Sequence, residues 1–167
     1  MNKLYNKSQI SNQIKILADA INNIHRDNPT PTVFIGLLNG CFMFYSDLVK
    51  NLDFDIECDF MRVKSYEGQK QGDIKIVKDI EASIKDKHIY LVDDILDSGN
   101  TMKEVIKYLN TKHPSSISIT TLLTRESSPT FEYPTYSAFT IKDEWILGYG
   151  MDNDKGYMRN YPEIFEL

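Results

Sequence analysis

The fold of this 167-residue chain is decided by one stretch, Leu91-Val92-Asp93-Asp94-Ile95-Leu96-Asp97-Ser98-Gly99-Asn100-Thr101. The apolar run at residues 88–92 predicts a buried strand that stops at the acidic pair. Residues 101–109 carry apolar side chains at helical spacing and predict a helix. A strand, a loop and a helix in this order place the loop beyond the carboxyl end of a strand, where ligands bind in open α/β sheets.

The second half of this loop has the features of a phosphate site. Backbone N–H groups at the N-terminus of the following helix favour an anion. Ser98 and Thr101 add hydroxyl donors, and Gly99 would let the backbone approach a ligand closely. We therefore expect a phosphate at this end of the stretch.

The first half is acidic and suits a different group. Asp93 and Asp94 would repel a phosphate in contact with them, but they suit two sugar hydroxyls or a hydrated Mg²⁺, which takes oxygen ligands. Asp97 lies between the halves and could act as a general base. A ribose 5-phosphate carries both kinds of group, so we expect an enzyme that binds one. The alternative without a binding function is that the acidic pair simply lies in a solvated loop.

The rest of the chain predicts one α/β domain over residues 1–167. A stripe at helical spacing, with Ser8 as its cap, predicts a first helix and comprises Ile10, Ile14, Leu17, Ile21 and Ile24. Residues 41–52 predict a second helix, and residues 67–71 a mobile loop. Strands are expected at residues 32–38, 56–63, 74–80, 117–123, 137–141 and 145–149. Strands that alternate with helices imply a mainly parallel sheet.

The composition narrows the classes of function. A net charge of −5, from 19 basic and 24 acidic residues, argues against nucleic acid as the main partner. Cys41 and Cys58 lie in apolar segments and are expected to be buried and unpaired. The first seven residues are too polar for a signal peptide, and the run at residues 33–38 is too short to span a bilayer. We expect a soluble cytoplasmic protein with no membrane partner.

Four ordered segments carry a resemblance to a known family. Residues 92–101 resemble the phosphoribosyl diphosphate (PRPP) motif of the type I phosphoribosyltransferases, and residues 37–44 the diphosphate loop of the hypoxanthine-guanine members. Residues 59–66 are similar to the entry to their catalytic lid, and residues 145–152 to their base-binding segment. The resemblance implies the fold of that family, a mainly parallel sheet flanked by helices with a small hood. It also implies a purine phosphoribosyltransferase, usually a homodimer or homotetramer.

The resemblance assigns roles to the central stretch. Asp93 and Asp94 would bind the ribose hydroxyls, one of them through Mg²⁺, and Asp97 would lie near N7 of the purine and assist proton transfer. The 5-phosphate would be bound by Ser98, Gly99, Asn100 and Thr101.

It assigns further roles outside that stretch. Diphosphate would contact Leu38, Asn39, Gly40 and Arg159. Members of this family often have a cis peptide bond in the segment that corresponds to residues 38–40. The purine would contact Arg125, Trp145 and the backbone of Ile146, and Asp152 beside them would touch a second Mg²⁺ through water. Ser65 and Tyr66 would close over the site as a lid and exclude water.

Three residues depart from the family pattern. Asn39 stands where a basic residue is common, Arg125 replaces a lysine, and Trp145 replaces the more usual phenylalanine. Arginine still donates to a carbonyl oxygen, but its fork is larger and planar. Hypoxanthine, guanine and xanthine therefore all remain candidate substrates.

Alternatives stand beside the first interpretation, which is transfer of the phosphoribosyl group from PRPP to N9 of a 6-oxopurine. The same fold serves regulators that bind RNA and sense nucleotides. A phosphorelay receiver also has an acidic pair, but on its first strand. At single residues, Trp145 could be core packing, Arg125 a surface charge, and Arg159 a tail charge paired with Glu163.

Overall fold

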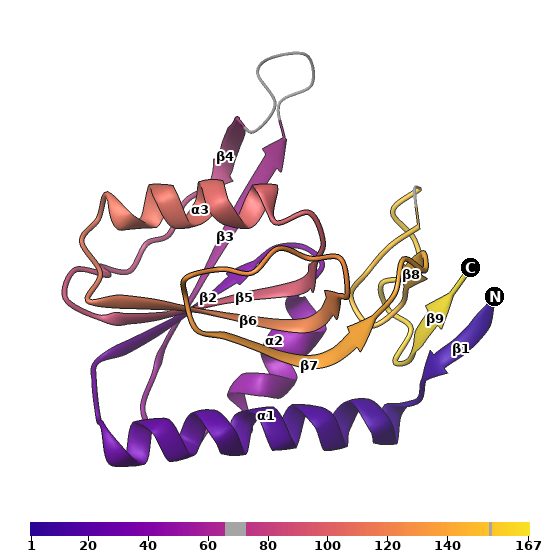
Figure 1. Ribbon diagram of the computed structural model, residues 1–167, viewed down its shortest axis with the longest axis horizontal. Helices are drawn as coiled ribbons and strands as arrows, with labels where there is room; N and C mark the ends of the chain where they lie inside the picture. The colour runs from indigo at the N-terminus through magenta and orange to yellow at the C-terminus, as the bar shows by residue number, and fades with distance from the viewer. Residues whose placement is uncertain (66–72, 154) are drawn as a thin grey trace.

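The computed structural model describes residues 1–65, 73–153 and 155–167, and its centre is a six-stranded sheet between helices (Figure 1). The strand order is β4-β3-β2-β5-β6-β7, and every neighbouring pair is parallel except β3 and β4. The bounds of these strands are β2 Thr32–Leu37, β3 Glu57–Ser65, β4 Ile74–Lys78, β5 His88–Leu96, β6 Ser116–Arg125 and β7 Thr135–Ile141. The expected mainly parallel sheet is therefore confirmed.

Helices cover both faces of this sheet. Helices α1 (Lys7–Asp27) and α2 (Phe42–Val49) lie on one face and α3 (Asn100–Asn110) on the other (Figure 1). The apolar stripe predicted for α1 is buried from Ile10 to Ile21. Ile24 is 40% exposed, so its assignment to this stripe was wrong. Because apolar cores form on both faces, the central strands are apolar runs and not alternating ones.

A small antiparallel sheet forms the hood. It consists of β1 (Asn2–Tyr5), β9 (Ile164–Glu166) and β8 (Ile146–Leu147), so the two ends of the chain meet there (Figure 1). A small hood was expected from the family resemblance. The strand expected at residues 145–149 is only two residues long. The predicted loop at residues 67–71 falls outside the described part of the chain.

Strand β5 corrects the expectation that the strand stops at the acidic pair. Asp93, Ile95 and Leu96 pair in register with β6, so the strand continues to Leu96. Successive side chains of a strand point to opposite faces. Asp93 and Asp94 are therefore held by a ladder, and they face different sides of the sheet end.

The N-terminus of α1 corrects the expected cap. Asn6, and not Ser8, is the N-cap: its side chain accepts from the N–H of Gln9 at 3.0 Å, and the Gln9 side chain accepts from the N–H of Asn6 at 2.9 Å. Ser8 lies within the first turn of the helix. This reciprocal pair is a capping box, in which asparagine replaces serine or threonine.

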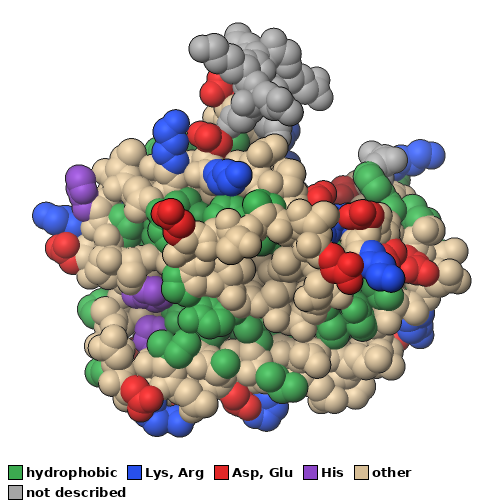
Figure 2. All heavy atoms as spheres, in the orientation of Figure 1, with side chains coloured by type: hydrophobic (Ala, Val, Ile, Leu, Met, Phe, Trp, Pro, Cys, Tyr) green, Lys and Arg blue, Asp and Glu red, His purple; other side chains and the backbone are tan. Residues whose placement is uncertain are grey.

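The structure shows the state of the two cysteines, the charges on one face of the surface and the apolar character of the helices. Cys41 is buried as expected, but Cys58 is exposed on β3, and both thiols are free. Figure 2 shows Lys and Arg side chains interspersed with Asp and Glu on the visible face. None of the described helices combines the length and the apolar character that crossing a membrane requires.

Candidate active site

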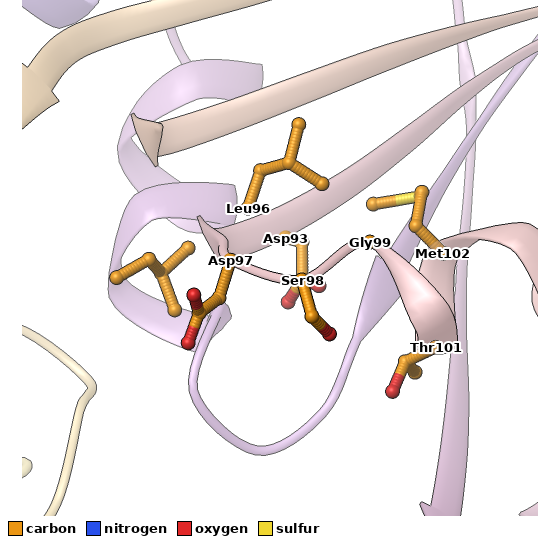
Figure 3. A pocket seen from close by; sticks show the side chains of 8 residues that line it. Asp93, Leu96, Asp97, Ser98, Gly99, Thr101 and Met102 are labelled. Carbon is orange, nitrogen blue, oxygen red and sulfur yellow. The ribbon is translucent and has the colours of Figure 1, made fainter. Parts of the chain in front are cut away.

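The loop between β5 and α3 forms one end of the site. Gly99 is the N-cap of α3 with φ 75°, and its carbonyl accepts from the N–H of Lys103 at 2.9 Å. The side chains of Asp97, Ser98 and Thr101 project to one side of the loop, while Leu96 and Met102 project to the other (Figure 3). A cavity of about 140 Å³ opens beside these side chains. The arrangement offers hydroxyls and a helix N-terminus to an anion.

The structure requires glycine at position 99 for two reasons that the sequence did not show. A Cβ atom on Gly99 would lie 2.7 Å from Cγ of Pro129 and 3.0 Å from Cζ of Phe131. The left-handed φ also disfavours any side chain here. Glycine is therefore fixed by backbone conformation and by packing against these two residues, and a bulky substitution would disturb the loop itself before any phosphate contact.

The acidic pair is bonded to its own backbone. Oδ1 of Asp93 accepts from the N–H of Asp94, and Oδ1 of Asp94 accepts from the N–H of Ile95, both at 2.9 Å. Burial raises the pKa of both carboxyls, and the neighbouring Asp94 raises the pKa of Asp93 further, whereas the charge of Arg159 acts to lower the pKa of Asp94. Both carboxylates are therefore held against the backbone at the end of β5.

The segment between β2 and α2 packs directly on this pair. Its Leu38–Asn39 peptide bond is cis, and the carbonyl of Asn39 accepts from the N–H of Phe42 at 3.2 Å. A Cβ atom on Gly40 would lie 1.8 Å from Oδ2 of Asp94, and one on Gly150 would lie 2.1 Å from the carbonyl oxygen of Gly40. Two glycines thus let the predicted diphosphate loop fit between the acidic pair and the segment that follows β8.

A second cavity, of about 220 Å³, adjoins the first. Its lining brings together Asp94, Ile95, Asp97, Arg125, Trp145, Ile146, Met151 and Asp152. Trp145 is 54% exposed, so the alternative that it packs in the core is wrong. The side chain of Arg125 is only 12% exposed and its Nε lies 3.2 Å from Oδ1 of Asp97, so it is no solvated surface charge.

Arg159 is placed by the same segment. Its Nη2 lies 2.7 Å from Oδ2 of Asp152, and its Nη1 donates to the carbonyl of Gly150 at 2.7 Å. Glu163 pairs instead with Lys3 at 2.9 Å, so the alternative tail pair of Arg159 and Glu163 is wrong. Arg159 therefore lies beside the glycine that contacts the diphosphate loop.

Some predicted residues fall elsewhere. Ser65 ends β3, but its side chain and all of Tyr66 lie outside the described part of the structure, and Asn100 does not line either cavity. Sequence reasoning missed the apolar walls, formed by Ile95, Leu96, Met102 and Met151. The sequence indicated these apolar residues only through their positions, since each lies within two residues of a polar residue that was predicted to be in the site.

Comparison with known proteins gives the family. The model of the phosphoribosyl transferase domain matches residues 6–154, which is most of the chain. The chain belongs to the phosphoribosyltransferase family. A related phosphoribosyltransferase, the hypoxanthine-guanine-xanthine phosphoribosyltransferase of Tritrichomonas foetus, is 36% identical over 96% of this chain and 88% of its own length.

Two further phosphoribosyltransferases extend the comparison. The hypoxanthine phosphoribosyltransferase of Escherichia coli K12 is 36% identical over 95% of this chain and 90% of its own length. The crystal structure of the hypoxanthine phosphoribosyltransferase of Staphylococcus aureus superposes with a TM-score of 0.91 at 34% identity, covering 99% of this chain and 90% of that one. The family resemblance and the fold expected from it are confirmed.

Proposed function

We propose that this phosphoribosyltransferase transfers the 5-phosphoribosyl group of PRPP to N9 of a 6-oxopurine in purine salvage, releasing diphosphate. The observation that carries the proposal is that the two cavities share Ile95 and Asp97. Hydroxyls and a helix N-terminus line one cavity, and an indole and a guanidinium line the other. A sugar phosphate and a flat base bound in them would meet beside Asp97.

The sugar phosphate would occupy the smaller cavity. Ser98, Gly99, Asn100 and Thr101 would bind the 5-phosphate through hydroxyls and N–H groups. The ribose hydroxyls would donate to the carboxylates of Asp93, which lines this cavity, and Asp94, which lines the larger one. The diphosphate would lie against Leu38, Asn39 and Gly40, with Arg159 nearby. Fixed donors at the departing diphosphate lower the barrier because they need no reorganisation when charge develops.

The base would occupy the larger cavity. Trp145 would stack on it, and Ile146 would meet its edge through backbone groups. Arg125 has donors and no acceptor, so it favours a 6-oxo group over a 6-amino group. Asp97 would accept or return a proton at N7 as the catalytic acid–base group. Ser65 and Tyr66 would cover the site as a lid.

Mg²⁺ is the metal that the donors fit. Among the described residues no three His, Cys, Asp or Glu side chains are grouped as a complete metal site. Mg²⁺ usually keeps several waters and is bound by one or two carboxylates together with substrate phosphates, which matches Asp93, Asp94 and Asp152 as partial ligand sets. Bound with PRPP, Mg²⁺ would neutralise charge on the diphosphate.

The domain organisation, the oligomeric state and the cellular compartment are proposed as well. We infer a single phosphoribosyltransferase domain over residues 1–167, acting in the cytoplasm as a homodimer or homotetramer. The free thiols of Cys41 and Cys58 are in keeping with a reducing compartment. The net charge of −5 and the mixed charges of Figure 2 favour the enzyme over an RNA-binding regulator.

One experiment tests the activity. The protein is incubated with PRPP, Mg²⁺ and, in separate reactions, hypoxanthine, guanine, xanthine, adenine and uracil, and nucleotide formation is followed chromatographically. We expect nucleotide from at least one 6-oxopurine and none from uracil. Nucleotide from adenine or uracil alone would contradict the substrate class, and no nucleotide from any base would contradict the activity.

A further inference from the structure

Arg125 makes more contacts than recognition of a base requires. Its Nη1 donates to the carbonyl oxygens of Lys142 at 2.8 Å and Glu144 at 3.0 Å. Its Nε lies 3.2 Å from Oδ1 of Asp97, and the side chain is only 12% exposed. One guanidinium therefore connects three segments of the chain before any ligand is present.

Those segments are the walls of the larger cavity. Asp97 lies in the loop after β5, and Lys142 and Glu144 follow β7 and lead directly to Trp145. Trp145 is 54% exposed, so its own packing fixes it weakly, and the two carbonyl contacts hold the backbone just before it. Within the described residues Nη2 has no hydrogen-bond partner, which leaves its N–H groups for a ligand.

The planar fork suits this task and an ammonium does not. Arginine has five N–H donors spread over three nitrogens, whereas lysine has three donors on one nitrogen. A single ammonium cannot reach a carboxylate, two carbonyl oxygens and a ligand in four directions. The residue type therefore matters for the shape of the cavity as well as for its charge.

We propose that Arg125 is a positioning residue that ties the Asp97 loop to the segment carrying Trp145 and so sets both walls of the cavity before a base binds. The identity of the ligand as a base rests on the proposed function, but the tie itself does not. In the unliganded protein, loss of the guanidinium frees the segment before Trp145. In the enzyme, it also releases Asp97 from its orientation.

Trp145 supplies the measurement, because it is the single tryptophan of the sequence. Fluorescence anisotropy and acrylamide quenching are measured without any substrate for wild type, Arg125→Lys and Arg125→Ala. We expect anisotropy to fall and quenching to rise in both variants. Arg26→Ala is the matched control, because it removes an exposed arginine paired with Asp53 at 2.8 Å, and it should leave Trp145 unchanged.

The outcomes separate the two roles of Arg125. Wild-type anisotropy and quenching in both folded variants would overturn the proposal and leave Arg125 as a ligand contact alone. Arg125→Lys keeps a long cationic side chain, so the test stands even if Arg125→Ala does not fold. Because no substrate is used, a protein that lacks the proposed activity still gives the result. With activity present, Arg125→Lys should lower kcat as well as raise KM for the base, with kcat/KM falling roughly tenfold or more.

Discussion

Gly40 and Asp94 are in direct contact: a Cβ atom on Gly40 would lie 1.8 Å from Oδ2 of Asp94. The first residue belongs to the proposed diphosphate loop and the second to the proposed ribose site, although they lie 54 positions apart in the sequence. The two subsites therefore share one boundary, and a change on one side displaces the group on the other.

Gly40→Ala should displace the Asp94 carboxylate and weaken PRPP binding. The obstructing atom is the end of a side chain, which can rotate, so the fold should survive. We expect PRPP affinity measured by calorimetry to fall about tenfold or more, as for loss of one charge-assisted contact. Ser46→Ala, an exposed position on α2, serves as the control.

A double-mutant cycle makes this prediction specific. If Gly40→Ala acts through Asp94, it should weaken PRPP binding much less in an Asp94→Ala background than in wild type. Additive losses in the double variant would mean that the methyl group acts on the diphosphate directly and not through the carboxylate.

Removal of metal should abolish turnover. The proposed ligands Asp93, Asp94 and Asp152 are oxygen donors that leave most of the Mg²⁺ shell to water and PRPP. We expect EDTA to stop nucleotide formation and an excess of MgCl₂ to restore it. Full activity in EDTA would remove the proposed metal role of all three carboxylates.

The sequence predicted the strand, loop and helix around residues 91–101 because their periodicity and turn residues agree. It placed the acidic pair outside the strand because aspartate is depleted in strands. The ladder from Asp93 to Thr121 overrides that local preference, and no local pattern shows it. The hood strands β1 and β9 are four and three residues long, too short for a period to appear.

The site was predictable where function depends on side-chain type and order. Two of the four ordered motifs contain Asp94, Asp97 and Trp145, and the family resemblance added Arg125 from outside them; all four residues line one cavity. The ties of Arg125 were not predictable, because its partners Lys142 and Glu144 contribute backbone carbonyls that any residue has. The packing of Gly99 on Pro129 was equally hidden, because the two meet only in the folded chain.

Choice of base should depend on Trp145 and Arg125 in different ways. Stacking on a base contributes roughly 1–3 kcal/mol and tolerates any base. Trp145→Ala should therefore lower kcat/KM alike for every accepted purine, with Trp145→Phe as the control that keeps a stacking ring. Arg125→Ala should narrow the gap between 6-oxo and 6-amino purines, because a 6-amino group would aim its donors at a buried cation.

The measurement is kcat/KM for hypoxanthine, guanine, xanthine and adenine with wild type and each variant. Wild type should use 6-oxopurines and reject adenine. A profile for Arg125→Ala that runs parallel to wild type across all four bases would show that Arg125 does not recognise the 6-position.

His88 should make stability fall in mild acid. It lies at the opposite end of β5 from the site, where its ring contacts the hydroxyl of Ser116 and lies 3.1 Å from that of Ser118. Burial, and secondly the nearby His25, lower the pKa of His88 to about 4. In the unfolded chain histidine takes up a proton below about pH 6.5, so between these values the unfolded state binds more protons. The contribution of His88 to the free energy of unfolding is therefore fully present above about pH 6.5 and is lost as the pH falls toward 4.

The free energy of unfolding, measured with urea at pH 7 and pH 5, should decrease by roughly 1–2 kcal/mol from His88. His88→Gln is expected to be less stable at pH 7, because it loses the fit to the two serines, but to lose less on acidification. His113→Asn is the matched control, since His113 is exposed and its φ of 58° suits asparagine, and it should keep the wild-type pH dependence. Equal losses between pH 7 and pH 5 in wild type and His88→Gln would show that His88 takes up its proton in the folded state as readily as in the unfolded state, and that other groups cause the loss of stability in acid.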